Sequence, residues 1–334
     1  MTNSKVSILM ATYNGARFLD EQLQSILNQT HQNLEIIIQD DGSTDNTMEI
    51  LRRYQAEDAR IQIHQNIKNL GINANFYSLI EKSTGDYIAI SDQDDVWLLD
   101  KIEVLLNSIG NASLIYTDSA LIDAKGKALG YTLLERFRHT PKHGEFLTDL
   151  FDVNTISGHA CLFDHHLKRP IEESVSVGFG EQGVFDMLIG TIASFKNGVI
   201  YHENPLTLHR IHELNNQNKV SIQAQDSIGF TPSNERKSRG ATFWKQSFWR
   251  HKYLRVNSKI NRAKIFRKHL KHLFSMFYED HLNPFMTAST SDKKETIRIF
   301  NFKLYRALLN ANISRKDAKK VCSGKILFYL TRFF

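Results

Sequence analysis

The chain has 334 residues, of which 41% are hydrophobic and 23% are charged, a composition typical of a soluble protein that buries a large core. No uninterrupted apolar run approaches ~18 residues and no signal-peptide pattern is present, which argues against a membrane-spanning or secreted protein. We therefore expect a cytoplasmic protein with one large domain and an appendage, or with two domains.

The charge of the chain is unevenly distributed. Its net charge is +6, and the basic excess lies in the last third of the sequence. The two cysteines, Cys161 and Cys322, are far apart and lack the spacing of metal ligands. Both are therefore expected to be reduced and buried.

Short apolar runs typical of buried strands alternate with segments of helical period. Strands are expected at 6–11, 34–38, 61–63, 87–90, 113–118, near 163, 198–202 and 206–210, and helices at 17–29, from 44 onward, at 73–83 and from 186 onward. A loop or hairpin is expected at 123–143. The alternation favours a mostly parallel sheet flanked by helices, so the expected fold class is α/β.

Polar residues follow three of the expected strands, at 12–14, 40–45 and 92–95. Carboxyl ends of parallel strands meet at one edge of a sheet, where open α/β sheets bind their ligands. The carboxylates of 92–95 repel one another unless donors or a cation lie nearby, and a divalent ion shared with substrate phosphates is a usual partner. An exposed acidic loop or a helix N-terminus is the alternative. We predict a binding cleft at this edge.

The sequence contains neither the G-x-G-x-x-G dinucleotide motif nor a P-loop. Carboxylates accept hydrogen bonds from a base or ribose but hold phosphate through a metal, which fits a nucleoside diphosphate. Segments 6–14, 40–45, 68–71 and 92–95 together resemble the signatures of glycosyltransferase family 2, with its Rossmann-like GT-A fold. The run Ser-Asp-Gln-Asp-Asp-Val-Trp that begins at Ser91 resembles the bacterial rhamnosyltransferase branch of this family.

The resemblance implies a nucleotide-sugar site along the predicted edge. In the family pattern Tyr13 stacks near a pyrimidine and Asp41 accepts its N3–H, with Thr12 and Asn14 close by. Asp92 is implied to lie near the ribose and the metal. The alternative for Tyr13 is ordinary packing.

The resemblance also implies a metal site. Asp94 is the expected main ligand of a Mn²⁺ or Mg²⁺ ion that bridges the diphosphate. Rhamnosyltransferase-like relatives carry a Tyr-Arg-x-His pattern, and this chain has His209 in place of the tyrosine. Arg210 is then a candidate diphosphate contact and His212 a second metal ligand, the alternative being surface residues without such roles.

Two segments are expected on the acceptor side. By resemblance, the stretch with Gly158 and His159 forms a wall of the acceptor site, although His159 fits a satisfied core histidine at least as well. Asp186 opens an apolar helix and matches the family's general base, with helix capping as the alternative. Phe185 occupies the position where the family usually has His or Glu, and Glu181 is the fallback base.

The sequence divides into a catalytic part, 1–220, and a basic, aromatic, helical C-terminal region, 221–334. Such a region suits an anionic membrane surface. Nucleic-acid binding uses the same ingredients and is the rival, although we expect no nucleic acid. Packing of the aromatic residues against the catalytic part is the third alternative.

The predicted function is inverting, metal-dependent transfer of a sugar. The favoured donor is dTDP-L-rhamnose and the favoured acceptor a lipid-linked cell-surface polysaccharide, at the inner face of the cell membrane. A UDP-hexose donor is the alternative with the same fold, and a non-catalytic nucleotide-sugar-binding or nucleic-acid-binding protein is the alternative from another class. The sequence leaves the linkage and the oligomeric state open, and a homodimer is compatible with it.

Overall fold

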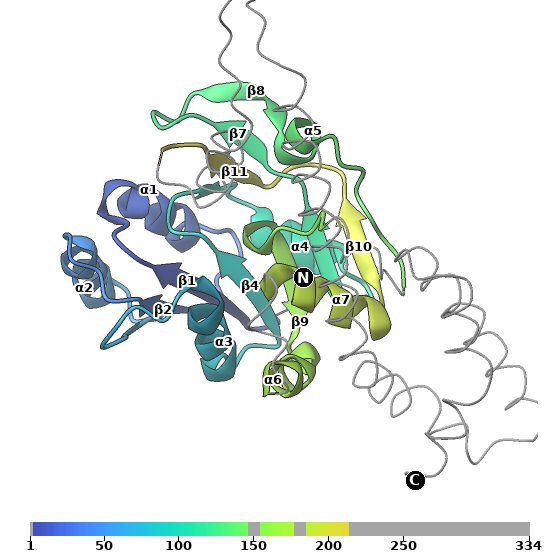
Figure 1. Cartoon of the computed structure of the whole chain (residues 1–334), viewed down its shortest axis with the longest axis horizontal. Helices are drawn as coiled ribbons and strands as arrows, with labels where there is room; N and C mark the ends of the chain where they lie inside the picture. Colours follow the sequence, from blue (N-terminus) through green and yellow to red (C-terminus); the bar gives the residue numbers. More distant parts are fainter. Residues whose placement is uncertain (1–2, 146–153, 177–184, 214–334) are drawn as a thin grey trace, which may run out of the picture.

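The computed structural model describes residues 3–145, 154–176 and 185–213. These residues form a central seven-stranded sheet in the order β10-β6-β9-β4-β1-β2-β3 (Figure 1). Its strands are β1 (Val6–Thr12), β2 (Leu34–Asp40), β3 (Ile61–Gln65), β4 (Tyr87–Ser91), β6 (Leu114–Thr117), β9 (Cys161–Asp164) and β10 (Val199–His202). The expected C-terminal region 221–334 lies outside the described residues, and the domain boundary stays a prediction.

The central sheet is mostly parallel, as predicted. Strand β1 pairs in parallel with β2 and β4, β2 with β3, and β6 with β10. Strand β9 runs antiparallel between β4 and β6, which the apolar pattern could not reveal. Every residue of β2 is buried, as expected for a parallel strand covered on both faces.

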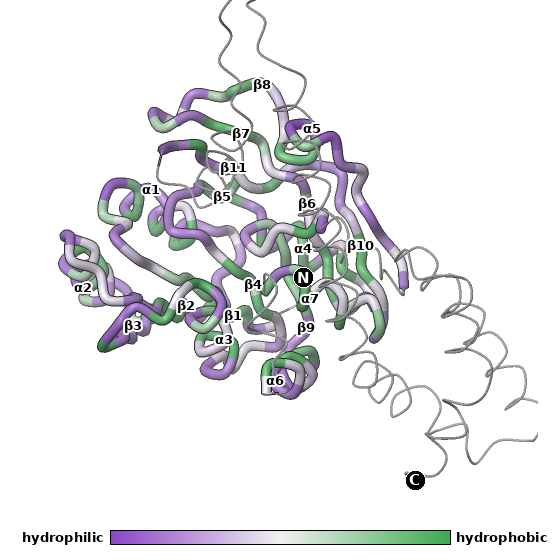
Figure 2. Tube along the Cα trace, in the orientation of Figure 1, coloured by the Kyte–Doolittle hydropathy of each residue, from purple (hydrophilic) through white to green (hydrophobic). Residues whose placement is uncertain are grey.

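Helices cover both faces of the central sheet. They are α1 (Ala16–Leu27), α2 (Thr47–Glu57), α3 (Ile72–Lys82), α4 (Lys101–Ser108), α6 (Lys168–Ser176) and α7 (Phe185–Phe195), whereas α5 (Leu133–Phe137) lies beside the second sheet. Successive residues of β1 point to opposite faces: Ile8 and Met10 join the core beneath α1, α2 and α4, whereas Leu9 joins the core of α3, α6 and α7. Figure 2 shows the hydrophobic colour concentrated on the inner strands.

A second, four-stranded sheet lies across the carboxyl end of the first. Its order is β5-β11-β7-β8, with β5 (Val96–Trp97), β7 (Ala120–Ile122), β8 (Ala128–Thr132) and β11 (Thr207–Arg210). The turn after β7 and strand β8 fall within the predicted loop or hairpin at 123–143, whereas β7 precedes it and α5 was not predicted. A capping box between Thr132 and Glu135 starts this short helix. The second sheet brings β11 to the edge that carries the acidic loop 92–95.

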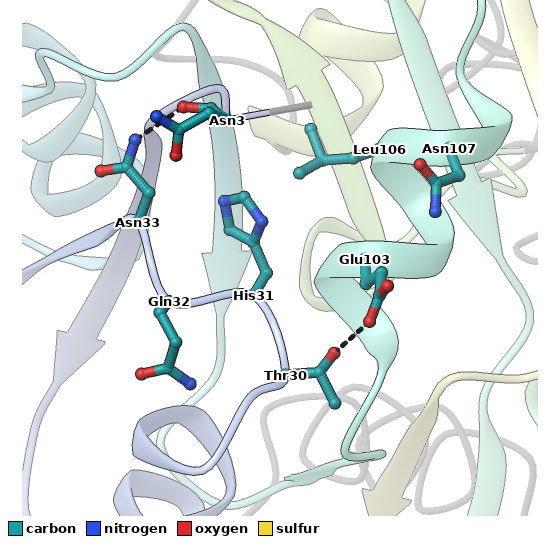
Figure 3. A pocket seen from close by; sticks show the side chains of 8 residues that line it. All are labelled: Asn3, Thr30, His31, Gln32, Asn33, Glu103, Leu106 and Asn107. Atoms are coloured by element: carbon teal, nitrogen blue, oxygen red, sulfur yellow. Dashed lines mark hydrogen bonds between the residues drawn. The ribbon is translucent and has the colours of Figure 1, made fainter. Parts of the chain in front are cut away.

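The opposite edge of the central sheet holds a polar hollow of about 440 Å³ (Figure 3). Asn3 and Asn33 line it just before β1 and β2 begin, and Asn33 donates to the Asn3 carbonyl over 2.7 Å. The hollow therefore lies away from the predicted cleft. Among the described residues, none of the helices is both long and apolar enough to cross a membrane.

Candidate active site

Three polar segments meet where the predicted cleft was expected. Thr12 pairs with Asp40 across β1 and β2, and Met10 pairs with Ser91 across β1 and β4. The residues that follow these strands are therefore neighbours at one edge. This adjacency follows from the parallel register, because aligned strands end at the same edge of the sheet.

The segment after β1 is held in a fixed shape. The Thr12 hydroxyl is buried and donates to Asp40 over 3.1 Å. The Tyr13 amide donates to the Gln93 side chain over 2.9 Å, while the tyrosine side chain remains 47% exposed. Asn14 adopts a left-handed conformation with φ of 48°, which asparagine tolerates better than most residues. The exposed Tyr13 ring is thus available for stacking, and its contact with a base stays a prediction.

Asp41 is buried and organises the loop that follows β3. One carboxylate oxygen accepts from the Asn66 side chain and from the Leu70 amide, each over 2.8 Å. The other accepts from the Gly71 amide over 2.9 Å, and Gly71 has a φ of 84° that favours glycine. These bonds give Asp41 a structural role that the sequence did not indicate. A hydrogen bond from Asp41 to a nucleobase stays a prediction.

Asp94 and His212 meet as a pair, although they are far apart in the sequence. His212 Nε2 lies 2.8 Å from Asp94 Oδ2, and the His212 ring packs 4.7 Å from the Phe18 ring. Burial raises the pKa of Asp94, while the bond to His212 opposes that shift and the charges of Asp95 and Asp92 add to it. A cation next to this carboxylate would offset both the burial and the repulsion. A carboxylate oxygen and an imidazole nitrogen are suitable ligands for Mn²⁺, so the pair fits the predicted metal.

Arg210 lies beside the metal candidates, but its guanidinium is engaged by the chain. Nε donates to the Asp94 carbonyl over 2.9 Å, Nη1 donates to the Asp123 carbonyl over 3.4 Å, and Nη2 pairs with the Glu21 carboxylate. The group also lies 4.8 Å from the centre of the Phe18 ring, and Arg210 is 2% exposed. Arg210 therefore fixes the backbone at Asp94, and a diphosphate contact stays a prediction.

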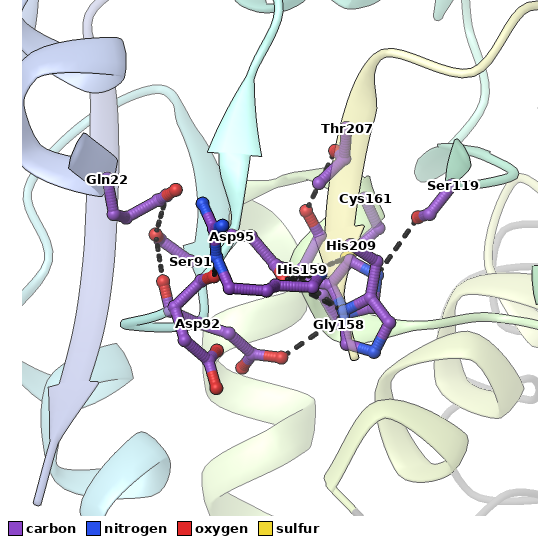
Figure 4. Close-up of polar contacts among 12 residues, drawn as sticks. Gln22, Ser91, Asp92, Asp95, Ser119, Gly158, His159, Cys161, Thr207 and His209 are labelled. Atoms are coloured by element: carbon purple, nitrogen blue, oxygen red, sulfur yellow. Dashed lines mark hydrogen bonds and ion pairs between the residues drawn. The ribbon is translucent and has the colours of Figure 1, made fainter. Parts of the chain in front are cut away.

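A largely buried group of Asp92, Asp95, His159 and His209, of which Asp92 is partly exposed, lies next to this pair (Figure 4). One ligand atom from each residue lies within 4.8 Å of the others, and such a set of carboxylates and imidazoles also fits a divalent cation. Asp95 Oδ1 already accepts from His209 Nδ1 over 2.8 Å. Neither Asp95 nor His209 was predicted as a site residue. The acidic run at 92–95 and the histidine in place of the family's tyrosine could have pointed to them.

Asp95 and His209 form a buried ion pair. Burial alone would raise the pKa of Asp95, but His209 and His159 outweigh it and hold that pKa well below its usual range. Burial alone would lower the pKa of His209, but the Asp95 carboxylate outweighs it and raises the pKa to about 9. Both shifts favour the charged form of each partner.

His159 has the setting of a satisfied core histidine. It is 4% exposed, its Nε2 lies 2.9 Å from the Ser119 hydroxyl, and its Nδ1 lies 3.3 Å from Asp92 Oδ2. Its ring stacks on that of His209, with centroids 4.5 Å apart and planes 3° apart. An acceptor-side role for His159 stays a prediction.

Asp186 lies in the first turn of α7 and faces the acidic loop. Asp186 Oδ1 accepts from the Asn154 side chain over 2.9 Å and from the Met187 amide over 2.6 Å, so it also caps the helix. Burial raises its pKa to about 6, and the charges of His159 and Asp92 also act on it. The base candidate and the acidic loop therefore lie on the same side of the molecule. The fallback, Glu181, lies outside the described residues.

Gly158 permits the packing of Phe185, the residue that departs from the family pattern. A Cβ atom at Gly158 would lie 2.7 Å from two ring atoms of Phe185. The Phe185 ring is buried and lies 4.3 Å from the Phe76 ring, so it has little room to move. The absence of a side chain at Gly158 therefore makes room for a side chain of the core.

We expect Gly158→Ala to lower the free energy of unfolding by about 1–3 kcal/mol, because overpacking a core displaces its side chains. Urea denaturation of Gly158→Ala, Phe185→Leu and the double variant measures this effect. The smaller leucine makes room for the added methyl group, so the alanine should cost less in the Phe185→Leu background. Strictly additive costs would mean that the Phe185 ring does not restrict position 158.

Residues 7–168 match the family model described as glycosyl transferase family 2. This segment, just under half of the chain, therefore has the sequence pattern of glycosyltransferase family 2. The chain is 34% identical over 146 residues to TuaG of Bacillus subtilis, which is named as a teichuronic acid biosynthesis glycosyltransferase. The match covers 42% of this chain and 56% of TuaG.

A second relative has a more specific name. Over 99 residues the chain is 43% identical to the dTDP-rhamnosyl transferase RfbG of Shigella flexneri, and the match covers 28% of this chain and 34% of RfbG. The chain spans about half the length of curated relatives that it matches, with 56% for TuaG and 50% for a Haemophilus influenzae glycosyltransferase.

The fold of the chain is also found in a solved structure. Residues 1–349 of Staphylococcus aureus TarS, crystallised with UDP-GlcNAc, align with a TM-score of 0.51 at 13% identity. The alignment covers 95% of this chain and 90% of that chain. Together with the family match, this likeness confirms the predicted GT-A fold.

Proposed function

We propose that the chain is an inverting, metal-dependent glycosyltransferase with a nucleotide-sugar donor. The observation that carries this proposal is the common placement of Asp186, the acidic loop and the Asp94–His212 pair at the carboxyl edge of the central sheet. Inverting transfer needs one positioned base and one centre that offsets charge on the leaving diphosphate. In this proposal Asp186 is the base, and the metal ion that Asp94 and His212 would hold is the centre that offsets charge.

Each group has one task in the proposed reaction. The Asp186 carboxylate accepts the proton of the acceptor hydroxyl as that oxygen bonds to the anomeric carbon and the bond from that carbon to the diphosphate breaks. Asp94 and His212 would hold the Mn²⁺ or Mg²⁺, which offsets charge on the departing diphosphate. Asp92 would orient the ribose, and Tyr13 and Asp41 would bind the base.

The proposed donor is dTDP-L-rhamnose. Two observations support it: the resemblance of the run that begins at Ser91 to the rhamnosyltransferase branch, and the match to RfbG over 28% of this chain. A UDP-hexose is the alternative donor for the same fold, because a pyrimidine and a diphosphate would make the same contacts.

The proposed acceptor is a lipid-linked cell-surface polysaccharide. The name of TuaG supports a polysaccharide product. The basic, aromatic region 221–334 supports contact with an anionic membrane surface, so we propose a cytoplasmic enzyme that is peripheral on the inner face of the cell membrane. That region lies outside the described residues, and the proposal for it comes from the sequence.

A donor panel tests the proposed function. The purified full chain is incubated with dTDP-rhamnose, UDP-glucose, UDP-galactose or UDP-GlcNAc, with Mn²⁺ or with EDTA, and the release of nucleoside diphosphate is followed. We expect one donor to be turned over in Mn²⁺ and the rate to fall to background in EDTA. Turnover that is unchanged in EDTA would contradict a metal-dependent enzyme. Donor binding without turnover of any donor, even with a lipid-linked glycan added, would favour the non-catalytic alternative.

A further inference from the structure

The second sheet must hold β11 in one register, because this strand leads to His212. Strand β11 pairs in parallel with β7 at three positions, from Leu208 to Arg210, but with β5 at only two, Thr207 and Leu208. Strand β5 itself follows the acidic loop directly. The ladder to β7 sets the register of β11 within the second sheet, whereas the short ladder to β5 fixes β11 only weakly relative to the acidic loop unless side chains add to it. Such side-chain contacts lie on the two residues that follow the segment paired with β5.

Asp95 accepts hydrogen bonds from two successive residues at the end of β11. Asp95 Oδ1 accepts from His209 Nδ1 over 2.8 Å and from the Arg210 amide over 3.1 Å. Arg210 Nε returns a bond to the Asp94 carbonyl over 2.9 Å. These three hydrogen bonds connect the acidic loop to β11. The Asp94–His212 pair lies next to them.

His159 and Lys101 make further contacts that hold His209 and β11 in place. The His209 ring stacks on that of His159 (Figure 4). The His159 carbonyl accepts from Lys101 Nζ over 2.6 Å, and the same ammonium donates to the Thr207 hydroxyl of β11 over 2.9 Å. Lys101 is fully buried, so these bonds are not in competition with solvent. Strand β11 is therefore fixed from both sides at His209.

We propose that His209 is a positioning residue, whose Nδ1–H bond to Asp95 holds β11 so that His212 meets Asp94. The inference rests on the proposed function, because it concerns the pair that would hold the metal.

Two variants separate the hydrogen bond from the ring. His209→Phe keeps an aromatic ring for stacking on His159 but has no donor, whereas His209→Asn places an amide N–H close to the position of Nδ1. We expect His209→Phe to weaken Mn²⁺ binding by roughly 10–100-fold, as loss of a group that orients a ligand does. His209→Asn should stay within about threefold of the original chain, because a hydrogen bond of similar geometry remains.

Binding of Mn²⁺ alone, followed by the electron paramagnetic resonance signal of the free ion, is measured on the full chain. Equal affinities for His209→Phe and the original chain would overturn the proposal. A tenfold or greater loss in His209→Asn would also overturn it, because His209 would then act as a metal ligand within the largely buried group. If His209→Phe does not fold, His209→Asn alone decides between these outcomes.

A second readout needs no metal. Hydrogen exchange of a peptide covering 207–212 in the metal-free chain should be faster in His209→Phe than in the original chain and unchanged in His209→Asn. Exchange that is the same in all three would overturn the proposal even if Mn²⁺ does not bind. Absence of Mn²⁺ binding by the original chain, with the expected exchange pattern, would instead contradict only the proposed function.

Discussion

Asp186→Asn is expected to lower kcat by roughly 10²–10⁴-fold, because that is the usual contribution of a positioned general base. Asparagine keeps the size of the side chain and an oxygen that can accept from Asn154 and Met187, but it cannot take a proton. The affinity for donor should be unchanged. Steady-state kinetics and calorimetric titration of the donor on the same samples measure the two quantities.

The matched control for Asp186→Asn is Glu49→Gln. Glu49 is also an acid in the first turn of a helix, α2, but it has no place in the candidate site. A general effect of removing charge from a helix start would therefore affect both variants alike. We expect full activity in Glu49→Gln. Retention of more than about a tenth of the original kcat in Asp186→Asn would reject Asp186 as the base.

The pH dependence of Asp186 gives the same hypothesis a second test. Burial raises its pKa from 3.8 to about 6, and only the deprotonated carboxylate accepts a proton. The rate should therefore rise with pH through about 6 and level off above it. The raised pKa also means that ionising Asp186 costs stability as the pH rises from 3.8 through about 6. Asp186→Asn should thus be at least as stable as the original chain at neutral pH, which excludes unfolding as the cause of lost activity.

Asp94→Asn is expected to have the second large effect, on metal binding and on kcat. We expect the metal to stabilise the charge on the leaving diphosphate by several kcal/mol, which corresponds to roughly 10²–10³-fold in rate. Asparagine also removes the negative charge that meets His212, so Mn²⁺ affinity should fall with the rate. Titration of Mn²⁺ and the rate of donor turnover measure both effects.

Asp20→Asn provides the control for Asp94→Asn. Asp20 pairs with Arg53 on the surface, where both side chains are about half exposed, so its removal should alter neither metal binding nor rate. Unchanged Mn²⁺ affinity in Asp94→Asn would show that the ion binds elsewhere. The largely buried group of Asp92, Asp95, His159 and His209 would then be the place to search.

The central sheet and its polar edge were predictable from the sequence because their signals are local. The apolar run that forms β2 and the acidic residues after it lie within a few positions of each other, and parallel strands align their ends. The buried setting of Cys161 was foreseen in the same way. The role of Asp186 as the general base, which the family resemblance implied, stays a prediction.

The contacts within the candidate site could not be predicted in this way. The bond between Asp95 and His209 joins residues 114 positions apart, and no local pattern fixes such a pairing. The second sheet is hidden for the same reason, because β5 has two residues and pairs with β11. Arg210 and Asp41 also show that the type of a residue does not determine its function. Both side chains form hydrogen bonds within the chain, which the sequence did not indicate.

The reversed direction of β9 bears on how the protein can be divided. The neighbouring strands β3, β2, β1 and β4 come from one continuous stretch of sequence. Strands β6 and β10 join them in the sheet only through β9. A fragment that stops before Cys161 would leave the backbone donors and acceptors of β4 uncovered along one side, and such open edges invite association between copies. Expression of a fragment that contains β1 to β4 therefore has to extend past Asp164.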